Sequence, residues 1–83
     1  MSLLYFAWVR QRVGKVEEIM ALPADVKTVS DLIMHLKRLG PGYADAFADE
    51  SRIRVAVNQR HARFDAAIDA EDEVAFFPPV TGG

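Results

Sequence analysis

The carboxyl-terminal segment constrains this chain more than any other part of its sequence. Residues 73–77 are mostly apolar, two prolines follow at positions 78 and 79, and the sequence ends in Gly82-Gly83. Proline fixes φ and has no N–H to donate to a sheet, so a strand is predicted to end at Pro78. Residues 78–83 then predict an extended tail, and its two glycines would let the backbone enter a channel too narrow for side chains.

Two interpretations of this tail are open from the residues alone. Four residues at roughly 3.3 Å each would let residues 80–83 span about 13 Å. The reactive group at the tip of such a tail would be the α-carboxylate of Gly83. Alternatively, the segment is a frayed, glycine-rich chain end without a function of its own.

The composition predicts one small domain that uses no thiol chemistry. The chain has 83 residues, of which 51% are hydrophobic and 27% are charged. This length accommodates a single domain over residues 1–83 with a small core. There is no cysteine, which excludes disulfides, cysteine-ligated metals and a side-chain thiol nucleophile.

Charge and hydropathy exclude further classes of function. A net charge of −2 gives no electrostatic case for binding nucleic acid. No apolar run approaches the ~20 residues needed to cross a membrane. The first residues lack the basic opening of a signal peptide, so we expect a cytoplasmic protein.

Apolar alternation predicts two strands near the amino terminus. Residues 4–9 alternate in a β-branched and aromatic stretch, which favours a strand with a buried face. Gly14 suits a turn with positive φ. Residues 16–22 predict a second strand, and the two strands together predict a hairpin.

One main helix follows. Thr28 and Asp31 fit a capping box at its start, and Gly40 is a good C′ residue that Pro41 follows as a stop. Residues 43–47 predict one or two further helical turns. The buried face of the main helix is predicted from apolar residues at helical spacing, namely Val29, Leu32, Ile33 and Leu36.

The second half of the chain predicts the rest of a sheet, with Asn58-Gln59 as a tight turn and Ile68 as a lone apolar anchor. Strands are expected over residues 53–57, 61–64 and 73–77. A single helix on one face of a mixed sheet is the economical α+β solution. The right-handed crossover rule places the first strand parallel to the last, at the centre of the sheet. This is a ubiquitin-like β-grasp fold of about five strands.

Short motifs that resemble one family recur along nearly the whole chain. They are Leu4-Tyr5-Phe6-Ala7, Val9-Arg10, Gly14, Leu22-Pro23, Thr28-Val29, Asp31-Leu32, Val55-Ala56-Val57-Asn58, Asp72-Glu73-Val74-Ala75-Phe76 and Pro78-Pro79-Val80-Thr81-Gly82-Gly83. Together they resemble the small, sulfur-carrying subunit of molybdopterin synthase. Most of these motifs are shared β-grasp features, whereas the final run is highly specific.

The resemblance implies that Gly83 carries sulfur. In this family an ATP-dependent activating enzyme adenylates the terminal carboxylate, and a sulfur donor such as a cysteine desulfurase displaces AMP to leave a thiocarboxylate. The tail then enters the large catalytic subunit of a heterotetrameric synthase, where the sulfur attacks cyclic pyranopterin monophosphate. Gly82 permits entry, and Val80 and Thr81 line the approach. ATP is used by the activating enzyme, and the carrier binds no cofactor or metal.

The resemblance also implies a partner interface. Of the last two strand residues, Phe77 is expected to face out of the core and to anchor both the synthase partner and the activating enzyme, although sheet packing alone would also explain it. His61 stands where relatives place an apolar contact residue. Arg10 is expected to hold a partner or the tail, or simply to be solvated.

Three alternative functions remain open, and the chain departs from the family pattern before the last strand. The chain could carry sulfur for thiamin or for transfer-RNA thiolation, act in ubiquitin-like conjugation, or be a non-reactive β-grasp binding module. Relatives often have Asp-Gly-Asp-Glu where this chain has residues 70–73. A positive φ at Glu71 would then cost about 1 kcal/mol of strain.

Overall fold

The computed structural model describes residues 1–79. The predictions for Val80, Thr81, Gly82 and Gly83 lie outside the described residues. The elements in chain order are β1 (Ser2–Tyr5), α1 (Ala7–Val13), β2 (Glu17–Ile19), α2 (Val29–Lys37), α3 (Pro41–Ala46), the 3-10 helix η1 (Glu50–Arg52), β3 (Arg54–Val57), β4 (Arg60–Ala62) and β5 (Glu73–Phe77).

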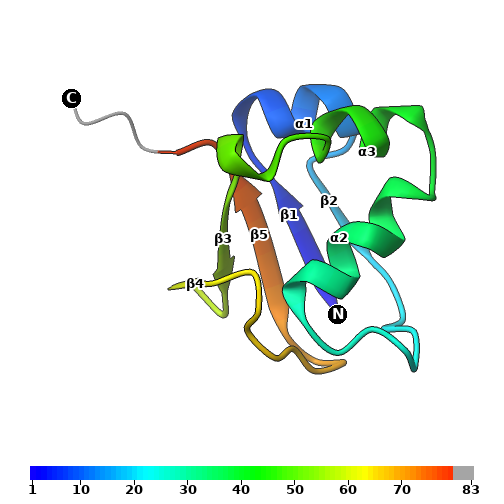
Figure 1. Cartoon of the computed structure of the whole chain (residues 1–83), viewed down its shortest axis with the longest axis vertical. Helices are drawn as coiled ribbons and strands as arrows, with labels where there is room; N and C mark the ends of the chain where they lie inside the picture. Colours follow the sequence, from blue (N-terminus) through cyan, green and yellow to red (C-terminus); the bar gives the residue numbers. More distant parts are fainter. Residues whose placement is uncertain (80–83) are drawn as a thin grey trace.

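The strands form one mixed sheet with the order β2-β1-β5-β3-β4. Strand β1 runs parallel to β5, and the remaining neighbours are antiparallel. Helix α2 crosses one face of this sheet (Figure 1). The predicted β-grasp arrangement, with the first and last strands paired at the centre, is therefore confirmed.

The core lies between the sheet and the helices. The ring of Phe76, on β5, stacks on Tyr5 with centroids 6.3 Å apart and meets Phe47 edge-on at 4.9 Å. The predicted apolar face of α2 is fully buried, at Val29, Leu32, Ile33 and Leu36. Burial of each such side chain contributes roughly 1.5–3 kcal/mol to the stability of the fold, so the packing of α2 against the sheet is a main source of that stability.

Residues 7–13 form helix α1, so the prediction of a strand through residue 9 was wrong. Val9 is fully buried and Val13 packs against the core one turn later, a helical spacing that the alternation of neighbouring aromatic residues obscured. Gly14 adopts a φ of 86° and donates its N–H to the Arg10 carbonyl, which caps the helix. Strands β1 and β2 pair as predicted, but a helix instead of a tight turn connects them.

Other boundaries also differ from the prediction. Strand β2 covers only residues 17–19, although Met20 still exchanges backbone hydrogen bonds with Met1; the residues after it lead away towards the first turn of α2. Arg38 is the C-cap of α2, while Gly40 is the N-cap of α3 and Pro41 its first residue. Proline suits that first position because its missing N–H has no partner there anyway. Helix α3 confirms the helical turns predicted near residues 43–47, although it begins at Pro41, whereas helix α1 was not expected.

The turns flanking β4 and β5 are held in different ways. Asn58 and Gln59 have φ values of 52° and 68°, as the predicted tight turn requires, and β4 then covers residues 60–62. Glu71 does not adopt a positive φ, so the strain expected there is absent. Instead the Asp72 carboxylate accepts from the backbone N–H of Asp69 at 2.7 Å and from the Asn58 amide at 2.9 Å.

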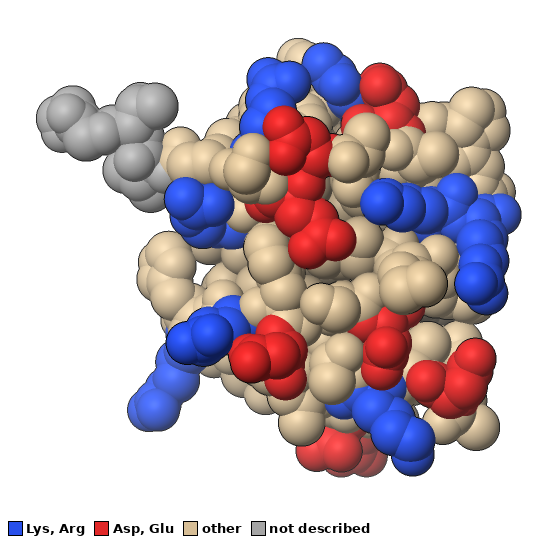
Figure 2. Space-filling model, in the orientation of Figure 1, with Lys and Arg blue, Asp and Glu red and all other residues tan. Residues whose placement is uncertain are grey.

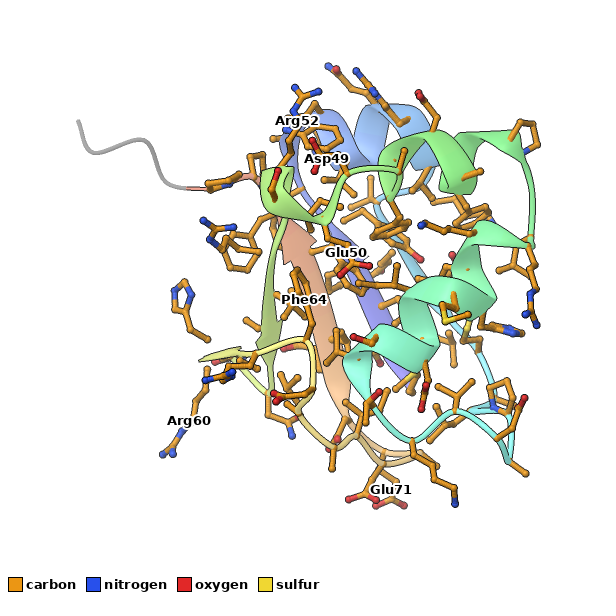
Figure 3. The ribbon with its side chains drawn as sticks, in the orientation of Figure 1. Asp49, Glu50, Arg52, Arg60, Phe64 and Glu71 are labelled. Carbon is orange, nitrogen blue, oxygen red and sulfur yellow. The ribbon has the colours of Figure 1, made fainter. Side chains whose placement is uncertain are left out.

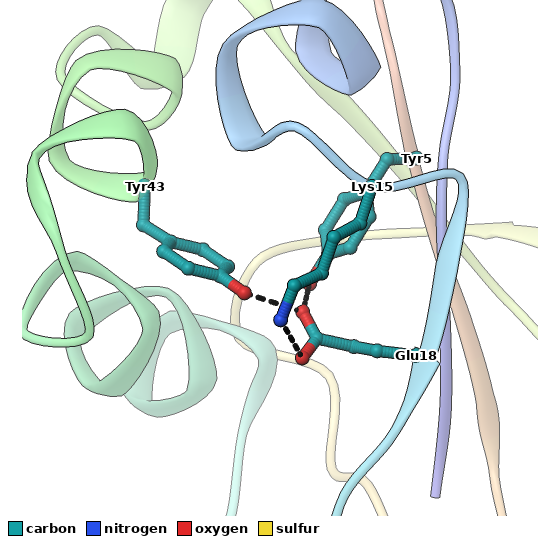
Figure 4. Close-up of polar contacts among 4 residues, drawn as sticks. All are labelled: Tyr5, Lys15, Glu18 and Tyr43. Carbon is teal, nitrogen blue, oxygen red and sulfur yellow. Dashed lines mark hydrogen bonds and ion pairs between the residues drawn. The ribbon is translucent and has the colours of Figure 1, made fainter.

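A polar cluster joins β1, β2 and α3 at one end of the core (Figure 4). The hydroxyls of Tyr5 and Tyr43 both donate to the same Glu18 oxygen, each at 2.8 Å. The Lys15 ammonium donates to the other oxygen at 3.3 Å. Only 16% of the Glu18 side chain is exposed, so these bonds replace most of its hydration.

The cluster shifts the ionisation of its members in opposite directions. Burial opposes the charge on Glu18, but hydrogen bonds from Tyr43, Tyr5 and Lys15 outweigh it, so the pKa of this carboxyl lies below its ordinary value. Burial, and then the hydrogen bond to the carboxylate, raise the pKa of Tyr5 far above its ordinary value. At neutral pH the cluster is therefore one anion held by two neutral phenols and one cation.

Gly42 is predicted to be required for the close approach of α3 to α1. A Cβ at this position would overlap the backbone carbonyl of Arg12, on α1. We expect Gly42→Ala to lower the free energy of unfolding by about 2 kcal/mol, because neither backbone can move without disturbing the packing. Chemical denaturation measures this. Gly40→Ala is the matched control, since its Cβ would make only an ordinary contact at 3.9 Å from Tyr43; equal losses in both variants would contradict the prediction.

Candidate functional site: the outer sheet face and the tail root

One face of the sheet is turned away from α2 and carries a mixture of apolar, small and basic side chains. Phe76 is completely buried, and Phe77 lies half-buried on the opposite face because side chains alternate along a strand. Strand register places directly opposed residues on the same face. The outer face, as we call it, comprises Leu4, Arg54, Ala56, His61, Ala75 and Phe77.

The structure brings together two of the predicted interface residues. The His61 ring meets Phe77 edge-on, with centroids 5.5 Å apart and planes at 84°. His61 comes from the edge strand β4 and is exposed, whereas Phe77 ends β5. The two side chains extend the apolar surface from the centre of the sheet towards its edge.

Arg10 is exposed, as predicted, but it lies on α1 and belongs to a different part of the surface. Its backbone carbonyl accepts the capping N–H of Gly14 at 2.8 Å. Nothing in the described residues joins its side chain to Phe77 or His61. Its role at a partner interface stays a prediction.

The sequence analysis missed Phe6 and Leu4 as parts of this surface. Phe6 is 47% exposed, and its N–H donates to the Phe76 carbonyl at 3.1 Å, beside the end of β5. Leu4 opposes Ala75 on the outer face. The alternation along β1 could have predicted this placement. Leu4 and Phe6 alternate with the buried Leu3 and Tyr5, so their side chains are expected on the opposite face.

The tail root, meaning residues 77–79, leaves the sheet between two other segments. Figure 1 shows the end of β5 next to η1 and the start of α1. The carbonyl of Phe76 is bound by α1 through Phe6, and Phe77 is paired with Arg54, which begins β3 just after η1. Two prolines follow, so the chain departs from the sheet at a fixed point.

The described residues have other surface features besides the outer face. Within residues 1–79 no three potential metal ligands cluster. A hollow of about 450 Å³ lies between β3, β4 and the start of α2, with Arg54, Arg63 and Asp65 in its wall. On the face that carries the helices, Figure 2 shows basic and acidic side chains interspersed. No helix in the described part of the chain has the length and hydropathy to cross a membrane.

Comparison with known proteins identifies the family. Residues 3–83 match the ThiS family, and this match includes both the sheet and the tail. This chain belongs to the ThiS family. The sequence of this ThiS-family chain is 42% identical over 82 residues to the molybdopterin synthase sulfur carrier subunit of Escherichia coli, covering 99% of the chain and 98% of the relative. The subunit of the same name from Haemophilus influenzae is 35% identical over 83 residues, covering 100% and 99%.

Solved structures support the same placement for the fold. A Pyrococcus furiosus protein assigned as molybdopterin converting factor subunit 1 superimposes with a TM-score of 0.74 at 33% identity, covering 95% of each chain. SAMP1 of Haloferax volcanii superimposes with a TM-score of 0.71 at 28% identity, covering 100% of this chain and 98% of the other. The β-grasp scaffold is thus shared across the family.

Proposed function

We propose that this chain is the sulfur carrier subunit of a molybdopterin synthase and acts in the biosynthesis of the molybdenum cofactor. The observation that carries the proposal is 42% identity, over almost the full length of both chains, to a protein of that function. The family match also extends through residue 83, so it includes the Gly-Gly end.

The working group in this proposal is the terminal carboxylate of Gly83. A carboxylate oxygen attacks the α-phosphorus of ATP on an activating enzyme, pyrophosphate leaves, and an acyl adenylate forms. The outer sulfur of a persulfide on a donor such as a cysteine desulfurase attacks the acyl carbon and displaces AMP, which gives an acyl disulfide. A thiol then attacks the donor's sulfur in this disulfide and becomes oxidised as a mixed disulfide, and the thiocarboxylate is released. Its sulfur is a nucleophile at neutral pH, which a chain without cysteine otherwise lacks.

The partners in this proposal use different parts of the chain. Residues 80–83 enter the large catalytic subunit, with Val80 and Thr81 along the approach and Gly82 at the narrowest point. The outer face, centred on Phe77 and His61, docks against the large subunit and, in turn, the activating enzyme. Aromatic side chains on an accessible sheet face are typical anchors of protein interfaces.

A second candidate function is ubiquitin-like protein modification. The likeness to SAMP1, the small archaeal modifier protein 1 of Haloferax volcanii, covers the whole chain at 28% identity. Both functions begin with adenylation of the carboxyl terminus, so only the fate of the activated group separates them. The higher identity to sulfur carriers favours sulfur transfer.

Mass spectrometry of the carboxyl-terminal peptide tests the proposal. After incubation with an activating enzyme, ATP and a sulfur source, we expect the peptide to gain the mass of one oxygen-to-sulfur exchange. Added large subunit and pyranopterin precursor should then restore the original mass and yield molybdopterin. Loading without conversion would favour another sulfur pathway, and an isopeptide-linked product would favour protein modification. Absence of both the sulfur gain and an isopeptide-linked product, under conditions where a control carrier loads, would refute both functions.

Phe77→Ala is expected to weaken binding to the large subunit about tenfold or more, because a central aromatic anchor carries a large share of an interface's energy. The fold should persist, since Phe77 is only half-buried while Phe76 fills the core. Titration calorimetry measures the affinity. Met34→Ala is the control, since Met34 is 56% exposed on α2. Equal affinity of Phe77→Ala and wild type would leave Phe77 as a sheet-packing residue only.

A further inference from the structure

Trp8 lies where three helical segments meet around the end of β5. The guanidinium carbon of Arg12, on the same helix, is 5.1 Å from the centroid of its ring. The guanidinium of Arg52, the last residue of η1, is 5.2 Å from the same centroid. Arg12 also pairs with Asp45 of α3 at 3.3 Å. One indole therefore connects α1 to η1 directly and to α3 through Arg12.

Both segments joined by Trp8 hold the end of β5. Helix α1 is attached through the Phe6 N–H, which donates to the Phe76 carbonyl at 3.1 Å. On the other side, η1 leads through Ile53 into Arg54, the residue paired with Phe77. Figure 3 shows Arg52 beside the start of α1, close to the point where β5 ends. The contact between Trp8 and Arg52 links these two segments on either side of the tail root, and we call this arrangement the bracket.

The bracket depends on two locally specified features. Ala7 has a φ of 53°, a strained value for a residue with a side chain, and this lets α1 begin directly after β1 with Trp8 facing η1. The turn of η1 is held by Asp49, whose carboxylate accepts from the Ser51 N–H at 3.0 Å and from its hydroxyl at 2.6 Å. The strained backbone at Ala7 thus positions the Trp8 indole, and the capped turn of η1 positions the Arg52 guanidinium against it.

We propose that Trp8, clasped by Arg52, is a positioning residue that fixes the direction in which the tail leaves the sheet. The inference rests on the proposed carrier function, because it assigns the bracket to delivery of the tail. Pro78 and Pro79 restrict φ, so the direction at Phe77 is passed along the chain instead of being lost to rotation. When the tail root keeps a single direction, the tail samples fewer orientations before it enters the channel of the large subunit. The entropic cost of binding is then lower.

Steady-state kinetics with loaded carrier and excess precursor test the proposal. Trp8→Leu should raise the KM of the large subunit for the carrier about three- to tenfold with kcat unchanged, since the channel walls orient the tail once it is inside. Trp8→Phe should recover part of the loss, because it restores an aromatic face. Arg52→Gln, an exposed position that does not threaten folding, should raise KM in the same direction, whereas Arg52→Lys should do so less.

Nitrogen-15 relaxation supplies a readout that needs neither loading nor a partner. Order parameters of the Phe76 and Phe77 amides should be near the ~0.85 of rigid backbone in the wild type and lower in Trp8→Leu and Arg52→Gln. Arg38→Gln, the same charge change on the C-cap of α2, should alter neither KM nor relaxation. Unchanged relaxation and KM would overturn the proposal. A higher KM with unchanged relaxation would also overturn it, in favour of direct contact between Arg52 and the partner. If wild type fails to transfer sulfur, the carrier function fails while relaxation still decides the positioning role.

Discussion

Removing Gly83, or adding one residue after it, is expected to abolish sulfur transfer without changing the melting temperature. In sulfur transfer the proposed reactive atom is the thiocarboxylate sulfur on the final residue, so a shift by one residue misplaces it by about 3.3 Å. Misplacement of only 1 Å can slow a reaction on the order of a hundredfold. Residues 1–79 contain the sheet and core, so stability should not respond.

The measurement pairs product formation with thermal unfolding on the same samples. Gly83→Ala is an informative companion variant, because it keeps the length and the carboxylate and adds only a methyl group to the tip. It should be loaded, and it should transfer slowly if the channel admits backbone only. Transfer at the wild-type rate by the deleted or extended chain would show that the terminal carboxylate is not the working group.

Glu18→Ala is expected to lower the free energy of unfolding by about 3 kcal/mol, because three charge-assisted hydrogen bonds are lost at once and two of them leave tyrosine hydroxyls behind. The Tyr5 hydroxyl is the more costly of the two left behind, since only 1% of that residue is exposed. Tyr43 is 9% exposed, so water can replace part of its bond. Urea denaturation at pH 7 measures the loss.

The same cluster predicts how stability depends on pH. Because the pKa of Glu18 is lowered in the folded state, its contribution is complete above the unfolded value of about 4.3 and fades as the pH falls through the folded value. Because the pKa of Tyr5 is raised, its contribution is complete below about 10 and fades as the pH rises. The advantage of wild type over Glu18→Gln should therefore shrink below about pH 4.

Tyr5→Phe and the double variant Tyr5→Phe/Glu18→Ala apportion the energy. Phenylalanine preserves the ring that stacks on Phe76 and removes only the hydroxyl. We expect the double variant to be less destabilised than the sum of the two single variants, because the unpaired Tyr5 hydroxyl is then absent. If the loss of unfolding free energy in the double variant equalled the sum of the losses in the two single variants, the role assigned to this hydrogen-bonded cluster would be contradicted. It would also be contradicted if the stability difference between wild type and Glu18→Gln did not change with pH.

Where the fold depends on neighbours in the chain, the sequence predicted it well. The capping box at Thr28 forms as expected, with Asp31 accepting from the Thr28 N–H at 3.2 Å and Thr28 accepting from Asp31 at 3.2 Å. Strand β5 covers the predicted residues 73–77, bounded by Pro78. Caps, proline stops and helical spacing act within one or two turns of the chain, so local sequence contains the necessary information.

Residues 7–13 show where this local information was ambiguous. Alternation through Phe6 and Trp8 favoured a strand, yet the segment is a helix that buries Val9. The choice depends on contacts from α3, where Gly42 permits close approach, and on the end of β5, which binds Phe6. These contacts join residues far apart in the sequence, and they override a weak strand preference that has no partner strand.

The sequence by itself determined the pairing of the first and last strands at the centre of a β-grasp sheet, the buried face of α2 and the end of β5. Only the tertiary structure decided that Glu18 binds two tyrosines, that His61 meets Phe77, and that Trp8 bridges α1 and η1 at the tail root. The physical reason is distance along the chain. Periodicity and capping are short-range and are written in adjacent residues, whereas a hydrogen-bonded cluster or a ring contact exists only after the sheet has brought its members together.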